Sequence, residues 1–380
     1  MPLEKIDEFG ADLSAVQEAI RTGITSKCAN ALDSRWERWD EFCSEHGLDP
    51  FLRQHTDPVP ILQVFGQRHR DGRNTPRGKP VKARTVEDAL RAVGQKFASV
   101  GAADLRKDAH GTIDFRIYRQ IRSYKKTDSP PVRVKPVPIT LVIYLLRVAH
   151  HVTGDEAQQA IADMITIAFY YLLRPGEYTG TTSDDTAFAI KDVTLHLGKR
   201  ALDWATASLA EIEAATSASY TFTTQKNGVR NKIIAHGRSH HPLCCPVTAT
   251  ICRILYHRRH NTPPEAPLAS YYRNNCHIAI KAQDVTDSLR HSATTNFHVT
   301  GIKASVISAR SLRAGGAMAL LCGNVDFDLI KMLGHWHSDA MMRCLHLQAQ
   351  PNMKRFAVAM FNDGQCTFLP EDTVPVNPQE

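Results

Sequence analysis

Two segments of the chain carry arginines in settings that suit the binding of an anion. Arg174 follows an apolar helical pattern, in the string Leu-Leu-Arg174-Pro-Gly-Glu177. There it would be either a charge near the helix C-terminus or a buried ligand for an anion. Arg310 and Arg313 are three residues apart on a predicted helix that Ser308 would cap, so their side chains should face the same way. Two guanidiniums on one face, with no acid nearby, are costly unless an anion binds them.

Two further side chains could bring hydrogen bonding and proton transfer to such a site. His335 stands in the string Leu-Gly-His-Trp, although a single histidine can equally be structural. Lys226 precedes Asn227-Gly228, a dipeptide that predicts a hairpin between two β-prone runs. A lysine at a hairpin tip can be merely solvated, and Arg230 and Lys232 on the same hairpin are alternatives to it.

Taken in order, these segments resemble the signature of the tyrosine recombinases, the phage-integrase family of DNA strand-exchange enzymes. The resemblance rests on four motifs: Leu-Arg174-Pro-Gly-Glu177, Ser308-Ala-Arg-Ser-Leu-Arg313-Ala-Gly-Gly, Leu333-Gly-His335-Trp336 and Ser338-Asp-Ala-Met-Met-Arg-Cys344-Leu-His346. The hairpin lysine lies between the first motif and the second. The sequence around Arg313 and His335 most resembles that of recombinases from Crypton-type mobile elements of eukaryotes.

The resemblance implies a role for each of these residues, and a fold. Arg174, Arg313 and His335 would contact the oxygens of a scissile phosphate, and Lys226 would protonate the leaving 5′ oxygen. A protein–DNA ester preserves the bond energy, so the reaction needs no metal, cofactor or ATP. The implied fold is mainly α with a small β-sheet, a helical SAM-like core-binding domain followed by a tyrosine-recombinase catalytic domain. The implied partner is double-stranded DNA, on which the protein would self-associate as a dimer or tetramer.

The chain departs from the family pattern at two catalytic positions. Arg310 stands where the pattern has a histidine, and Cys344 stands where it has the nucleophilic tyrosine. A thiolate is a good nucleophile, but the cysteine side chain is much shorter than that of tyrosine, and a misplacement of ~1 Å can cost ~100-fold in rate. Each difference can arise from one A-to-G change in a codon. We therefore expect impaired catalysis, in a decayed mobile-element copy or in a chain retained as a non-cleaving, regulatory DNA-binding protein.

A cluster of histidines and cysteines supports a third hypothesis, a metal protein: His236, His240, His241, Cys244 and Cys245. Their spacing fits no common zinc pattern, and adjacent cysteines rarely both bind one metal ion. We therefore expect no metal.

Composition is typical of an intracellular globular protein. With 380 residues, 43% of them hydrophobic and 22% charged, the chain can form two domains with cores of their own. No apolar run is long enough to span a membrane, the N-terminus lacks a signal-peptide pattern, and the nine cysteines are scattered and odd in number. We expect reduced thiols, no membrane partner, and a nuclear location if the source is eukaryotic.

Charge is distributed unevenly, which favours a polyanion partner for one region. Residues 1–50 have a net charge of −6 and residues 51–135 one of +11, although an ordinary solvated basic surface would give the same count. A Gly/Pro-rich loop at 66–84 and one side of a predicted helix at 113–126 gather the residues that we expect to bind DNA: Arg68, Arg70, Arg73, Arg77, Lys79, Lys82, Arg84, Arg116, Arg119, Arg122 and Lys126.

Four prolines between 127 and 138 predict an extended linker between two domains. We expect a helical domain at 1–126, a catalytic domain at 139–365 and a disordered tail at 366–380. Within them the patterns predict a helix from about 59 to 65, one capped by Thr85 that ends near Val100, and longer helices at 139–150 and 155–173. Strands should follow within 186–236, and helices again from Val247 onward.

Overall fold

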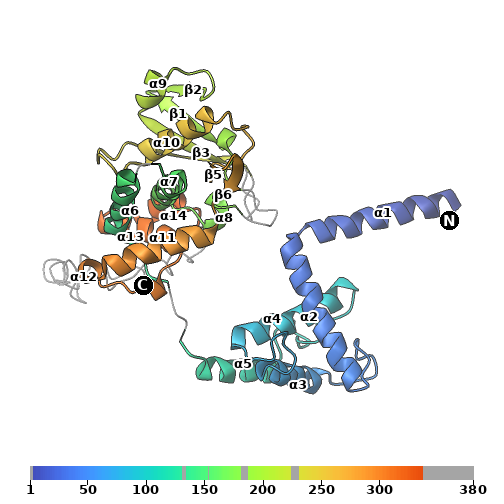
Figure 1. Cartoon of the computed structure of the whole chain (residues 1–380). Coiled ribbons are helices and arrows are strands. Elements are labelled where there is room, and N and C mark those ends of the chain that lie inside the picture. The colour runs from blue at the N-terminus through green and yellow to red at the C-terminus, as the bar shows by residue number, and fades with distance from the viewer. Residues whose placement is uncertain (1–2, 131–133, 153, 181–186, 224–230, 337–380) are drawn as a thin grey trace, which may run out of the picture. The chain divides into compact units, whose positions relative to one another are not determined.

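The computed structural model describes residues 3–130, 134–152, 154–180, 187–223 and 231–336 (Figure 1). The chain forms two compact units, Met1–Pro131 and Val132–Glu380. The division lies inside the segment 127–138, for which the sequence predicts a linker. Both ends of this segment are bound to a unit, since Asp128 pairs with Arg70 in the first and Val137 is fully buried in the core of the second. The expected tail lies outside the described residues.

The first unit packs four helices around an aromatic core, and one more helix precedes these four in the sequence. The packed helices are α2 (Ser26–Glu45), α3 (Val59–Arg70), α4 (Ala83–Ser99) and α5 (Phe115–Thr127), and the preceding one is α1 (Leu3–Thr22). At the centre of the core, the ring of Trp39 lies edge-on to Phe65 with centroids 5.2 Å apart. The buried indole N–H of Trp39 donates to the carbonyl oxygen of Pro50, which satisfies its hydrogen bond.

The start of α4 corrects one expectation. The sequence predicts a cap at Thr85, but α4 begins at Ala83, and Thr85 lies inside the helix. Lys82 occupies the N-cap position, and its side chain makes no capping hydrogen bond. Instead the backbone N–H of Ala83 donates to Oδ2 of Asp128, 2.9 Å away, while Oδ1 of Asp128 accepts from Arg70. A carboxylate distant in sequence thus takes the place of a local cap.

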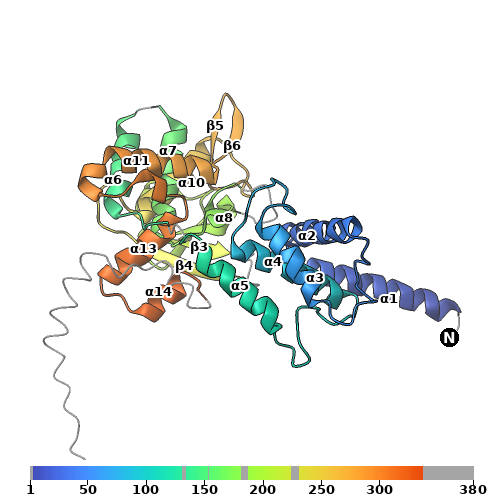
Figure 2. The same ribbon diagram turned by 90° about the horizontal axis from the view of Figure 1, so that it is seen from below.

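The second unit packs helices around a small antiparallel sheet. Its helices are α6 (Ile139–His151), α7 (Glu156–Tyr170), α8 (Pro175–Tyr178), α9 (Leu209–Glu213), α10 (Pro246–Arg259), α11 (Ala282–Thr295), α12 (Phe297–Thr300), α13 (Ser311–Cys322) and α14 (Phe327–Leu333). α7 is buried on most of its circumference and packs against α6, α10 and α13, which explains its almost continuous apolar sequence. α13 and α14 lie side by side (Figure 2). Among the described residues, no helix is long and apolar enough to cross a membrane.

The sheet confirms the hairpin that the sequence predicts. Strands β1 (Val193–Leu197), β2 (Arg200–Leu202), β3 (Ser217–Phe222) and β4 (Lys232–Gly237) lie in the order β2-β1-β3-β4, and every neighbouring pair is antiparallel. In the β3–β4 pair, the last described partners are Phe222 and Lys232. Lys226 and Asn227-Gly228 lie between them, outside the described residues.

A second hairpin lies where the sequence predicts only helices. Strands β5 (Ser270–Arg273) and β6 (Cys276–Ala279) are antiparallel and are joined by Asn274 and Asn275. Both asparagines have positive φ, 51° and 61°. Asparagine tolerates this left-handed region, and two such residues in succession suit the tight turns that hairpins prefer. The Asn-Asn pair between β-prone residues was therefore a usable signal.

Candidate functional site

The start of α13 gives the two neighbouring arginines different surroundings. Ser308 does not cap this helix, contrary to the prediction; Arg310 occupies the N-cap position, and its side chain makes no capping hydrogen bond. The backbone N–H of Ser308 instead donates to Oγ of Ser311, 3.2 Å away. Arg310 is exposed, whereas Arg313 is only 7% exposed. The sequence predicts that both side chains face the same way, but the structure exposes Arg310 and buries Arg313.

Arg313 is held by two carbonyl oxygens and one aromatic ring. Nη1 donates to the carbonyl oxygen of Leu172, 2.6 Å away, and Nη2 donates to that of Gly334. The guanidinium carbon lies 4.0 Å from the centre of the Trp336 ring, within range of a cation–π interaction. Leu172, the first acceptor, has a φ of 52°, and His335, which follows the second acceptor Gly334, has a φ of 53°. Both values lie in the left-handed region. Such conformations are uncommon outside glycine, and here they direct two carbonyl oxygens at one guanidinium.

A pair of glycines fixes α13 against neighbouring backbone. A Cβ atom on Gly315 would lie 2.2 Å from the carbonyl oxygen of Val137, and one on Gly316 would lie 2.1 Å from that of Phe169. The Gly-Gly pair predicts such a close approach, and the structure confirms it. The contact with Phe169 on α7 sets the position of Arg313, which lies less than one turn before Gly316.

Arg174 reaches the same region from the start of α8. It is the N-cap of this short helix, where its backbone N–H donates to Oε2 of Glu177 at 2.6 Å and Nη1 donates to Oε1 at 2.7 Å. Nη2 also donates to the carbonyl oxygen of His335, 3.4 Å away. The arginine side chain is 38% exposed, so an anion can approach it from solvent. Glu177 therefore orients Arg174 without covering it.

His335 and Lys232 lie at the C-terminal end of α14. The backbone N–H of His335 donates to the carbonyl oxygen of Met332 at 3.2 Å, and its ring stands edge-on to Phe222 of β3, with centroids 4.3 Å apart. Lys232 of β4 donates from Nζ to the same oxygen of Met332, 2.9 Å away. Burial lowers the pKa of Lys232 below its ordinary value. Its ammonium therefore releases a proton more readily than that of a fully solvated lysine.

Three cations from distant parts of the chain thus donate to the backbone of one helix end. Arg174, Lys232 and Arg313 bind carbonyl oxygens within residues 332–335. The last carbonyls of a helix lack intrahelical partners and carry partial negative charge, which favours cations there. An oxyanion would be a stronger acceptor than a neutral carbonyl, because hydrogen bonds between charged partners are roughly twice as strong. Within the cluster, Arg174 is the arginine that an anion can approach from solvent, because its side chain is 38% exposed whereas Arg313 is buried.

The remaining catalytic candidates lie outside the described residues. Lys226 and its alternative Arg230 fall within 224–230, and Cys344 falls within 337–380. The structure therefore does not place the hairpin lysine or the nucleophile position. Lys232, the other alternative on the hairpin, belongs to the described residues and lies at the cluster.

Two histidines of the metal hypothesis have structural partners. The ring of His236 lies edge-on to Tyr171, with centroids 4.7 Å apart. Nδ1 of His241 accepts hydrogen bonds from the backbone N–H groups of Leu243 and Cys244. In the part of the chain that the structure describes, no group of three or more His, Cys, Asp and Glu side chains could hold a metal ion.

About half of the side chains predicted to bind DNA are already paired within the first unit. Ion pairs engage Arg68, Arg70, Arg73, Arg84 and Arg116. Arg116 lies 2.5 Å from Asp57 and 3.0 Å from Asp114, so it joins two segments of the fold and has little capacity left for a phosphate. Among the described residues, no ion pair engages the other six: Arg77, Lys79, Lys82, Arg119, Arg122 and Lys126. The predicted loop is also shorter than 66–84, because α3 continues to Arg70.

Sequence reasoning missed the residues that position Arg313. Leu172 lies inside the run predicted as helix to 173, and α7 in fact ends at Tyr170. Trp336 was part of a motif, but nothing in its position indicated a ring stacked on an arginine. The contact between Arg313 and Leu172 joins residues 141 positions apart. The contact between Arg313 and Trp336 depends on the irregular backbone that follows α14. Neither contact leaves a local pattern in the sequence.

Comparison with known proteins places the fold. No protein-family model and no curated protein matches the chain. Among solved structures, it is similar to the XerH site-specific recombinase bound to palindromic difH substrate, with 12% identity over 86% of this chain and 77% of that one and a TM-score of 0.50. It is also similar to the Tn1549 transposon integrase in complex with transposon right end DNA, with 12% identity over 86% of this chain and 98% of that one and a TM-score of 0.45. A third similar structure is the XerA recombinase, with 13% identity over 89% of this chain and 100% of that one and a TM-score of 0.36. The likeness to XerH confirms the predicted fold class, mainly helical with a small antiparallel sheet, as in the tyrosine recombinases.

Proposed function

We propose that this chain is a DNA-binding protein of the tyrosine-recombinase or integrase type, derived from a Crypton-type mobile element. In this proposal, loss of the nucleophilic tyrosine impairs DNA strand breakage and rejoining. The observation that carries it is the gathering of Arg174, Arg313 and His335 at the end of α14 in a chain with this fold. The XerH recombinase was solved with its difH substrate, which supports duplex DNA as the partner of the present chain.

The cluster would hold one phosphate of the DNA backbone. Arg174 and Arg313 donate to its non-bridging oxygens, on which negative charge grows as a fifth ligand bonds to phosphorus. A nucleophilic oxygen attacks phosphorus, the bond from phosphorus to the 5′ oxygen breaks, and a lysine transfers a proton to that oxygen. Lys226 is the acid that the family pattern assigns. Lys232 is a second candidate, because it already lies at the cluster and its pKa is lowered.

Catalysis would fail at the first step because of Cys344. Its thiol would have to reach the phosphorus atom that the arginines hold, from a position that suits the much longer tyrosine side chain. Arg310 adds a second defect, since a branched guanidinium does not reproduce the hydrogen bonds of an imidazole. The chain would then bind DNA without forming a protein–DNA ester.

The first unit would supply most of the sequence-independent affinity. Its six cations without ion pairs would contact backbone phosphates of the duplex, and the protein would self-associate as a dimer or tetramer on that duplex. In a eukaryotic source the protein would act in the nucleus.

The phosphate site can be tested by measuring how the protein binds a labelled duplex. Fluorescence anisotropy gives the affinity at each of a range of salt concentrations. Arg174→Ala should weaken binding about 10- to 100-fold, as expected when one charge-assisted hydrogen-bond partner is lost. Arg200→Ala is the matched control, because Arg200 is also exposed and ion-paired, 2.5 Å from Glu211, but lies on β2 at the far edge of the sheet. Absence of binding at low salt, or equal losses in both variants, would contradict the proposal.

The alternative is a non-cleaving, regulatory DNA-binding protein. The intact arginine contacts favour this alternative as much as they favour a mobile-element copy that decayed recently. Arg174 and Arg313 keep ordered partners although the nucleophile position holds Cys344. Both versions predict DNA binding. They differ in whether Cys344→Tyr restores cleavage, since a chain adapted to binding alone would have lost further catalytic geometry.

A further inference from the structure

Helix α1 carries an apolar stripe that is open to solvent. Phe9, Leu13, Val16 and Ile20 are 56%, 47%, 53% and 68% exposed. Their spacing of four, three and four residues puts them on one face of the helix. Four large exposed side chains in a row are unusual on a soluble protein and indicate a surface for another molecule.

The same helix is acidic and stands away from the bundle of its own chain. It contains five acidic and two basic residues, and Glu8, Asp12 and Glu18 beside the stripe are exposed. Only the stretch Gly23–Thr25 separates α1 from α2, and α2 joins the aromatic core only from Trp36 onward. α1 therefore projects from the free end of α2, away from α4 and α5 (Figure 1).

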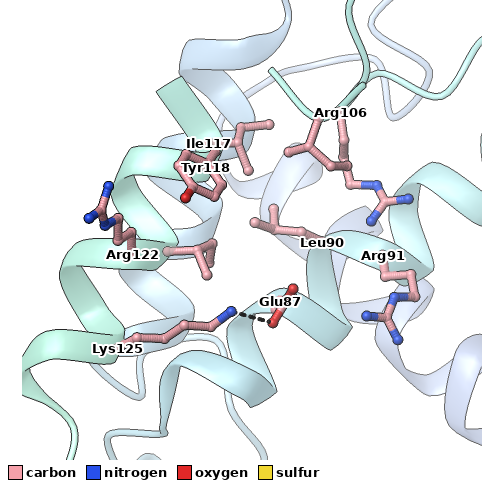
Figure 3. A pocket seen from close by; sticks show the side chains of 10 residues that line it. Glu87, Leu90, Arg91, Arg106, Ile117, Tyr118, Arg122 and Lys125 are labelled. Atoms are coloured by element: carbon pink, nitrogen blue, oxygen red, sulfur yellow. Dashed lines mark ion pairs between the residues drawn. The ribbon is translucent and has the colours of Figure 1, made fainter. Parts of the chain in front are cut away.

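A groove between α4 and α5 has the complementary shape. It has a volume of about 470 Å³, and Figure 3 shows its side chains. Leu90, Ile117 and Ile121 form a buried apolar floor, while Ile113 and Tyr118 line it and are 40% and 53% exposed. The volume lies in the range of sites that accept ligands or anchoring side chains.

The groove also has the complementary charge. Four cationic side chains and one acid line it: Arg91, Arg106, Arg122, Lys125 and Glu87. Glu87 pairs with Lys125 at 3.2 Å (Figure 3). Arg91 pairs with Asp88, and Arg106 pairs with Asp104. Among the described residues, Arg122 is the lining cation without an ion pair, so the net positive charge of the groove comes from Arg122.

We propose that α1 of one chain docks, apolar stripe first, into the α4–α5 groove of a second copy. An amphipathic helix in an apolar groove is a common recognition mode, and the acidic flanks of α1 meet the cationic rim. Pairing of two α1 helices with each other is disfavoured, because it would bring two acidic helices together along a stripe of only about two heptads. The contact does not depend on the phosphate site. Arg122 is also predicted to bind DNA, so the test is made without DNA and leaves Arg122 unchanged.

Two single variants of the full-length chain test this contact by sedimentation velocity. Leu13→Glu places a charge in the stripe, and Tyr118→Glu places one in the groove; both side chains are exposed, so the fold should survive, as circular dichroism will check. The wild type should self-associate reversibly and less strongly at high salt, and each variant should be monomeric. A mixture of the two variants, each with its own label, should associate, because one intact helix and one intact groove remain. Val100→Glu, a charge at another exposed site (56%), should associate like the wild type.

Three outcomes would overturn the proposal. A wild type that stays monomeric at all concentrations would leave α1 unpartnered or bound within its own chain. Association that Leu13→Glu abolishes but Tyr118→Glu does not would indicate pairing between α1 helices. Failure of the two variants to associate with each other, when each alone is monomeric and folded, would exclude a contact between helix and groove.

Discussion

Replacing Gly316 with alanine should push α13 away from α7 and destabilise the second unit. The added Cβ would lie 2.1 Å from the carbonyl oxygen of Phe169, whereas ordinary contacts begin at 3.4 Å. The obstacle is backbone, so it cannot rotate away as a flexible side chain could. Overpacking of this kind costs about 1–3 kcal/mol, and the gain in helix propensity from glycine to alanine offsets about 0.5–1 kcal/mol. Because the obstacle is backbone, the cost should lie in the upper half of that range, about 2–3 kcal/mol. The net loss should then be about 1–2.5 kcal/mol, which lowers the melting temperature of a unit of this size by about 2–10 °C.

Differential scanning calorimetry measures this loss in the transition of the second unit. Gly176→Ala is the matched control, because a Cβ there would have no neighbour within 4 Å, and its stability should stay within about 0.5 kcal/mol of the wild type. The helix that moves also carries Arg313, so Gly316→Ala should weaken DNA binding as well. A Gly316→Ala chain as stable as the wild type would show that α13 and α7 are not in the close contact described.

Three other predictions concern the first unit. Replacing Arg119 and Arg122 with alanine should weaken binding to every duplex and reduce the slope of log affinity against log salt by about 2, because each cation releases about one counterion. Arg116→Ala should leave that slope unchanged and lower the melting temperature of the unit, because Arg116 is held by two carboxylates; the reverse result would contradict its structural role. Burial opposes ionisation of Asp128, but hydrogen bonds from Arg70 and from the first N–H of α4 outweigh it and hold its pKa below the usual value. Its contribution to stability should therefore be complete above about pH 4 and decline as the pH falls toward the lowered pKa, and Asp128→Asn should remove this decline in an acid titration followed by circular dichroism. An unchanged titration in Asp128→Asn would show that other carboxylates carry the acid sensitivity.

Features that a local pattern encodes were predictable from the sequence. The β3–β4 hairpin follows from β-prone residues on both sides of a turn signal, and pairing as far as Phe222 and Lys232 confirms it. The Gly315-Gly316 pair predicts close backbone contact for the same reason, since only glycine tolerates it. The spacing of Arg174, Arg313 and His335 resembles a family motif, and the structure brings the three residues together.

Contacts between distant segments were not predictable in this way. Asp128 replaces Thr85 at the start of α4 through a hydrogen bond that spans 45 residues. Arg116 faces the side of α5 from which DNA contacts were expected, yet Asp57, 59 residues away, pairs with it. Propensity and periodicity describe neighbours along the chain, so they miss acceptors that only tertiary folding supplies.

In the proposed function, the arginine cluster is a scissile-phosphate site that has lost its nucleophile, and one measurement tests this directly. The direct measurement uses the double variant Cys344→Tyr with Arg310→His, incubated without metal or ATP with a pool of nicked duplexes of random sequence. Covalent adducts are then isolated in denaturing detergent and their DNA is sequenced. The wild type should give no adduct, the double variant should give a phosphotyrosyl adduct on a defined sequence, and addition of Arg174→Ala should abolish it. Contrary results would be a double variant that binds DNA but forms no adduct, or a wild-type adduct that disappears on Cys344→Ser, which would show that the thiol itself is a working nucleophile.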